Sequence, residues 1–141
     1  MSRIFWDTNL FIYLLEGEGE PANNVTALLS RIKERGDQLY SSVLTLGEVL
    51  VKPLEQGQVD LAARYEATLG PPVVTLVPLD RGGARIYARM RQDRSIRSPD
   101  AIQLACAASA GCDVFITNDD RLSRKVVPGI QFIVSLERAP L

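Results

Sequence analysis

The chain has 141 residues, of which 46% are hydrophobic and 23% are charged, and its formal net charge is −1. This composition predicts one globular domain over residues 1–141, and so small a net charge gives no global attraction to nucleic acid or to an anionic membrane. The sequence has no histidine, which excludes a histidine general base, a Ser-His-Asp triad and the usual histidine-containing zinc sites. Any catalysis must therefore use carboxylates, hydroxyls, lysine or a hard metal ion.

The sequence has no apolar run near the roughly 20 residues that a membrane-spanning helix needs. The N-terminus also lacks the basic head, apolar stretch and small-residue cleavage site of a signal peptide. We therefore expect a cytoplasmic protein without a membrane partner.

The N-terminal stretch predicts a buried strand that ends at an acid. Ile4-Phe5-Trp6 is too short for a helix and is rich in strand-forming side chains, whereas Thr8-Asn9 and the apolar residues after them predict a helix. Ligands of open α/β sheets bind at the carboxyl ends of the strands, so Asp7 would lie at such a site. Taken alone, Asp7 is better explained as a helix cap, because Asp is a favoured cap residue.

The next segments alternate between helix and strand. We expect a loop over residues 16–21, a helix ending near Gly36, and a short strand over residues 38–43. A further helix opens at Thr45, where Thr45-x-x-Glu48 fits a capping box, and Lys52-Pro53 should interrupt it. The capping box is the alternative explanation for Glu48.

The middle of the chain carries a stripe of arginines. After a helix over residues 59–69 and a strand over residues 73–77, Asp80 should cap a helix on which Arg81, Arg85 and Arg89 recur every four residues. A solvated helix face explains most such stripes, and polyanion binding is the alternative.

The last third repeats the pattern of strand, acid and helix. Ser98 can cap a helix with Pro99 at its first position and Asp100 in its first turn, and the helix dipole alone could explain Asp100. A strand over residues 114–116 then leads to Asp119 and a short helix, and residues 130–134 form the last strand. The chain therefore predicts an α/β fold with a parallel sheet of about five strands covered on both faces.

Four acids, Asp7, Glu48, Asp100 and Asp119, occupy strand-to-helix junctions or first helical turns, which converge on one edge of a parallel sheet. Carboxylates packed together repel one another unless a cation neutralises them. Hard oxygen ligands without histidine or thiolate favour Mg²⁺ or Mn²⁺. Such an ion can generate a hydroxide nucleophile and polarise a phosphodiester.

These motifs, in this order, resemble the PIN domain and most closely the VapC-type toxins. The resemblance covers nearly the whole chain and rests on Asp-Thr-Asn at residues 7–9, Thr-Leu-Gly-Glu-Val-Leu at 45–50, Ser-Pro-Asp-Ala-Ile-Gln-Leu-Ala at 98–105 and Phe-Ile-Thr-Asn-Asp at 115–119. It implies a three-layer α/β/α fold and a Mg²⁺- or Mn²⁺-dependent endoribonuclease. It also implies a homodimer and inhibition by a small cognate VapB-type antitoxin.

The resemblance assigns roles to particular residues. Asp7, Glu48, Asp100 and Asp119 would be catalytic, and Asp7, Asp100 and Asp119 would bind the metal. Asp119 is preferred to Asp120 because it matches the family's Thr-Asn-Asp. Supporting hydrogen bonds are expected from Thr8, Asn9, Thr117 and Asn118. Separately from the resemblance, the shared helix face of Arg81, Arg85 and Arg89 suggests that these arginines contact RNA.

Two other interpretations compete with this one. A catalytically silent PIN-like module could bind RNA or a protein, although such a module has no reason to gather four carboxylates against polyanionic RNA. An aspartyl-phosphate phosphatase also begins with an acid after a strand, but its pattern requires a second Asp two residues on, where this chain has Asn9.

Overall fold

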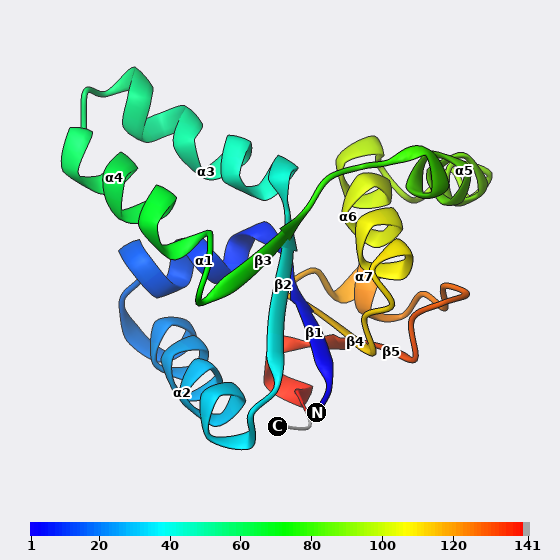
Figure 1. Cartoon of the computed structure of the whole chain (residues 1–141), viewed down its shortest axis with the longest axis horizontal. Helices are drawn as coiled ribbons and strands as arrows, with labels where there is room; N and C mark the ends of the chain where they lie inside the picture. Colours follow the sequence, from blue (N-terminus) through cyan, green and yellow to red (C-terminus); the bar gives the residue numbers. More distant parts are fainter. Residues whose placement is uncertain (140–141) are drawn as a thin grey trace.

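The computed structural model describes residues 1–139 as an α/β structure (Figure 1). The strands are β1 (Arg3–Trp6), β2 (Gln38–Ser42), β3 (Val74–Val77), β4 (Val114–Thr117) and β5 (Phe132–Ser135). The helices are α1 (Thr8–Glu16), α2 (Gly19–Arg35), α3 (Val43–Glu55), α4 (Val59–Thr68), α5 (Arg81–Met90), α6 (Ser98–Ser109), α7 (Asp120–Ser123) and the 3₁₀ helix η1 (Leu136–Arg138). The last two residues of the expected domain, 140–141, lie outside the described residues.

The five strands form one parallel sheet in the order β3-β2-β1-β4-β5. β1 is central, and the chain adds β2 and β3 on one side of it before adding β4 and β5 on the other. The order therefore reverses between β1 and β4, and ligands of such sheets bind beside the carboxyl ends of the strands at this switch point. The predicted parallel sheet of about five strands is confirmed.

Alternate residues of the strands face two separate cores. Ile4 and Trp6 lie with α1, α2, α3 and α4 in one core, whereas Phe5 lies in the other with residues of α6 and α7. Phe5 also stacks on Phe115 of β4, with ring centroids 5.1 Å apart. Figure 1 shows α1–α4 on one side of the sheet and α5–α7 on the other, which confirms the three-layer arrangement. Burying each of these large apolar side chains stabilises the fold by about 1.5–3 kcal/mol.

Helix α3 differs from the sequence prediction at both ends. It begins at Val43, because the Ser42 hydroxyl accepts a hydrogen bond from the Thr45 amide at 3.1 Å and thus caps the helix. The predicted capping box at Thr45 is therefore wrong. The predicted interruption at Pro53 is also wrong, since Pro53 is buried in the last turn and its carbonyl still accepts from the Gln58 amide at 2.8 Å.

Two other helix starts also differ from the sequence prediction. The predicted loop over residues 16–21 shrinks to residues 17–18, and Pro21 is tolerated in the first turn of α2, where amide hydrogens lack partners within the helix. At α6 the cap position is Arg97, and the Ser98 hydroxyl instead hydrogen bonds the Tyr87 hydroxyl of α5 at 2.7 Å. None of the helices in residues 1–139 is long and apolar enough to cross a membrane.

Candidate active site

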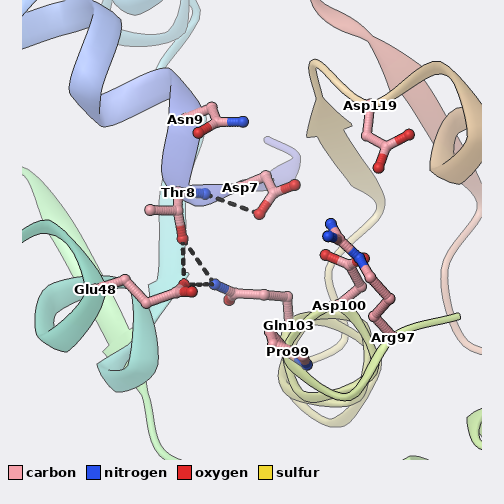
Figure 2. A pocket seen from close by; sticks show the side chains of 9 residues that line it. All are labelled: Asp7, Thr8, Asn9, Glu48, Arg97, Pro99, Asp100, Gln103 and Asp119. Carbon is pink, nitrogen blue, oxygen red and sulfur yellow. Dashed lines mark hydrogen bonds and ion pairs between the residues drawn. The ribbon is translucent and has the colours of Figure 1, made fainter.

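The four acids singled out in the sequence line one pocket at the switch point (Figure 2). The pocket has a volume of about 230 Å³. Figure 2 shows Glu48 on one side, Asp100 and Asp119 on the other, and Asp7 between them. The lining residues are Asp7, Thr8, Asn9, Glu48, Arg97, Pro99, Asp100, Gln103 and Asp119.

Asp7 is fixed at the end of β1 through both carboxylate oxygens. Oδ1 accepts the Thr8 amide at 2.8 Å, which caps α1, and Oδ2 accepts the Thr117 hydroxyl of β4 at 2.8 Å. Burial raises the pKa of Asp7 against these two hydrogen bonds, and the negative charges of Asp100 and Glu48 raise it further. Asp7 is therefore both a cap and a carboxylate whose ionised form a nearby cation would stabilise.

Asp119 lies after β4 and caps the short helix α7. Its Oδ1 accepts the amides of Arg121 and Leu122 at 2.9 and 3.4 Å, and its Oδ2 lies 3.4 Å from the Arg121 guanidinium. Burial raises the pKa of Asp119, but the hydrogen bonds from Arg121 and Leu122 outweigh burial, so the pKa falls below its usual range. The adjacent Asp120 is exposed and does not line the pocket.

Asp100 and Glu48 reach the pocket from the two helical layers. Asp100, in the first turn of α6, accepts the Arg97 Nε–H at 3.2 Å. Glu48 Oε1 accepts the Thr8 hydroxyl at 2.7 Å and lies 3.4 Å from Gln103 Nε2. Glu48 thus contacts α1 and α6 rather than the start of its own helix.

Two lining residues were missed by the sequence analysis as members of the site. Arg97, just before the predicted helix start at Ser98, was given no role, although it lies 3.2 Å from Asp100. Gln103 is 1% exposed and was read only as part of a helix. A glutamine amid the apolar residues of the run from Ala101 to Ala107 was the available signal, because a buried amide must find hydrogen-bond partners.

The predicted supporting residues behave differently from one another. Thr8 and Thr117 donate to Glu48 and Asp7, whereas the side-chain amide of Asn118 donates to the Tyr13 hydroxyl at 2.7 Å. Asn9 lines the pocket from the first turn of α1. The arginines at 81, 85 and 89 are exposed on α5 and are absent from the lining residues.

The pocket offers oxygen ligands, which suit a hard divalent cation, but its carboxylates are not closely spaced. Within residues 1–139, no three acidic or cysteine side chains lie close enough together to hold a metal ion as they stand. Mg²⁺, however, keeps several waters and takes only one or two carboxylates. The oxygen-only donors and the raised pKa of Asp7 fit an ion held partly through water.

The chain belongs to the PIN domain family. The PIN domain family model matches residues 4–127, most of the chain. The fold and the order of the acids thus agree with the family expected from the motifs. Comparison with curated proteins finds no match to this chain.

Solved structures of similar fold come from toxin–antitoxin complexes. The VapBC-5 structure from Mycobacterium tuberculosis is 25% identical, with a TM-score of 0.60 over 96% of this chain and 99% of that one. VapBC2 from Rickettsia felis, bound to promoter DNA, is 14% identical, with a TM-score of 0.71 over 94% and 98%. A toxin–antitoxin complex from Klebsiella pneumoniae is 22% identical, with a TM-score of 0.66 over 90% and 94%.

Proposed function

We propose that this chain is a metal-dependent endoribonuclease and the toxin of a type II toxin–antitoxin pair. The observation that carries the proposal is the meeting of four carboxylates in one pocket of a PIN domain whose sequence has no histidine. An acid cluster of this kind repels a phosphodiester unless a cation intervenes. A metal-activated water accounts for the hydrolysis without a protein nucleophile.

In this proposal Asp7, Asp100 and Asp119 hold Mg²⁺ or Mn²⁺ directly or through water. Such an ion would, when bound, lower the pKa of a coordinated water and polarise the phosphodiester. Thr117 and the Thr8 amide hold Asp7 in place, and Thr8 holds Oε1 of Glu48. Oε2 of Glu48 can accept a proton from the attacking water. Arg97, the cation among the lining residues, binds the phosphate.

The partners in this proposal are RNA, a small VapB-type antitoxin and a second copy of the chain, all in the cytoplasm. The support for the antitoxin is that two structures of similar fold are described as a toxin–antitoxin complex or as a member of a family of toxin–antitoxin systems, and that this second structure and a third are described as VapBC.

The direct test is cleavage of a structured RNA by the purified protein. We expect cutting with Mg²⁺ or Mn²⁺ and none after addition of EDTA, with activity restored by excess metal. Binding of RNA without cleavage under any of these metals would favour the catalytically silent module. Cleavage that persists in EDTA would overturn the metal-dependent mechanism.

A further inference from the structure

A buried hydrogen-bond network underlies Glu48 and centres on Gln103. It joins four segments, because Ser42 ends β2, Thr45 lies on α3, Thr8 begins α1 and Gln103 lies on α6. Ser42, Thr45 and Gln103 are each at most 1% exposed. Figure 2 shows the Gln103 amide reaching Thr8 and Glu48 at the pocket wall. Polar groups this deeply buried are costly unless every one is paired.

The donor and the acceptor of each hydrogen bond in the network follow from the number of protons that each group carries. The Ser42 hydroxyl donates to Gln103 Oε1 at 2.5 Å, so the two Nε2 hydrogens point away from Ser42. The two shortest contacts of Nε2 are with Thr45 Oγ1 at 2.7 Å and Thr8 Oγ1 at 3.0 Å, and Glu48 Oε1 lies further away at 3.4 Å. The Thr8 hydroxyl has one proton, which it gives to Glu48 Oε1 at 2.7 Å.

The hydroxyl proton of Thr45 is also donated toward Glu48, through Thr8. Thr8 and Thr45 oxygens lie 3.1 Å apart, and because Thr8 has already donated to Glu48, the proton between them comes from Thr45. The hydrogen bonds between the Gln103 amide nitrogen and Glu48 therefore all point toward the carboxylate. Only an amide can do this, since Oε1 accepts from Ser42 while Nε2 supplies the donors.

We propose that Gln103 is a positioning residue that holds Glu48 in the pocket by making Thr8 a donor to it. This inference rests on the proposed nuclease function for its catalytic consequence. Glu48 is an exposed residue on α3, and its long side chain has several rotamers available. The hydrogen bond from Thr8 selects one of them, and Gln103 determines the direction of that bond.

Two isosteric substitutions separate positioning from packing. Gln103→Glu keeps the shape but replaces the donor with an acceptor, so the Thr8 proton is drawn to residue 103 and away from Glu48. Gln103→Met fills the space without hydrogen bonds. If either variant fails to fold, Thr8→Val removes the same link from the half-buried end of the network, and Thr8→Ser restores it.

The matched control is Tyr65→Phe. It removes a partly buried hydrogen bond between Tyr65 of α4 and Glu16 at the end of α1. Neither residue lines the acidic pocket. If the Gln103 variants lowered activity only by destabilising the protein, Tyr65→Phe should lower it to a similar extent.

Crystal structures of the variants and their cleavage kinetics test this proposal. In crystals of Gln103→Glu, and of Thr8→Val, we expect Glu48 to leave its wild-type rotamer, whereas in Tyr65→Phe it should stay. In cleavage assays Gln103→Glu should lower kcat roughly tenfold to a hundredfold, as loss of an outer-shell partner does, with KM little changed. In a Glu48→Gln background the same change should have no further effect.

Each outcome decides one of the two claims. An unmoved Glu48 in the Gln103 variants, or an equal loss of kcat in the Glu48→Gln background, would overturn the positioning role while leaving the nuclease intact. Absence of cleavage by the wild-type protein would overturn the proposed function, and the crystal structures would still decide whether Gln103 positions Glu48.

Discussion

Asp7 combines a structural role with a charge that opposes folding. Its Oδ1 caps α1, which an asparagine could also do. Its ionised form, however, is penalised by burial and by Asp100 and Glu48, which together raise its pKa. The carboxylate therefore costs stability in the absence of a cation, and this cost is expected where function rather than folding selects the residue.

Asp7→Asn should raise the melting temperature of the metal-free protein at neutral pH. The pKa of Asp7 is higher in the folded than in the unfolded chain, so its contribution to stability is present at low pH and is lost as pH rises through the folded-state pKa. We therefore expect the variant to be more stable than the wild type at neutral pH.

The measurement is thermal unfolding of both proteins across pH, with and without Mn²⁺. Below the unfolded pKa of aspartate the difference should vanish, because Asp7 is then neutral in both states. Mn²⁺ should stabilise the wild type more than Asp7→Asn. A variant that is less stable than the wild type at neutral pH would contradict the charge penalty.

Asp119 and Asp120 are adjacent acids with different expected roles. On a helix one residue corresponds to about 100° of rotation, and only Asp119 lines the pocket. Asp119→Asn should lower metal-dependent cleavage tenfold or more, whereas Asp120→Asn should leave it near wild type. Both should lose little stability, because Asn also caps helices and a charge near a helix N-terminus contributes only about 0.3–1 kcal/mol. Greater damage from Asp120→Asn at equal folding would show that the roles are reversed.

The acids were identifiable from the sequence because each follows a recognisable strand or helix start. Gln103 was not, since its importance depends on which helices lie opposite it. Gln103 meets Thr8 and Thr45, which lie 95 and 58 residues away in the chain. A local sequence pattern cannot predict contacts between residues so far apart in the chain.

Among the secondary-structure elements, apolar runs predicted the strands well, whereas the helix caps were predicted unevenly. Asp7 and Asp80 cap helices as expected, but the predicted caps of α3 and α6 are wrong. Residues 4–6 and 114–116 lie in strands, as their side chains suggested. The start of α3 was displaced because Ser42 and Thr45 are both good caps. Ser42 is selected by the end of β2 and by its bond to Gln103. Tertiary contacts thus decided between equivalent local signals.

The arginines of α5 remain a prediction for RNA binding. Helix α5 packs on α6, outside the pocket, with Arg81, Arg85 and Arg89 exposed. If they contact phosphates, each loss should lower the slope of log affinity against log salt by about 0.7 for single-stranded RNA. The measurement is RNA binding by the triple alanine variant over a salt series. An unchanged slope would indicate a solvated helix face.

At the scale of the whole molecule, strand order brings the acids together. β1 pairs directly with β4, with Trp6 opposite Ile116, so Asp7 and the segment leading to Asp119 leave the sheet side by side. The sequence indicated parallel strands and alternating helices. It did not determine which strands are neighbours, because pairing depends on long-range packing rather than on local preference.

The toxin assignment predicts growth inhibition that a neighbouring small protein relieves. Expression of the chain alone should slow growth of a bacterial host, and coexpression of the antitoxin should restore it. Asp7→Asn, at matched expression, should be harmless. If the wild type is equally harmless, the toxin role loses its support, although a nuclease role would survive. The molar mass in solution should be that of a homodimer.

The cleavage rate of the wild type against Asp7→Asn tests the central claim most directly. Both proteins should be folded, by thermal unfolding, and compared at saturating Mn²⁺ on one structured RNA under single-turnover conditions. Asp7→Asn should cut at least tenfold to a hundredfold more slowly, because it removes a carboxylate from the proposed metal site. Equal rates in the two proteins would contradict a mechanism based on the carboxylate cluster.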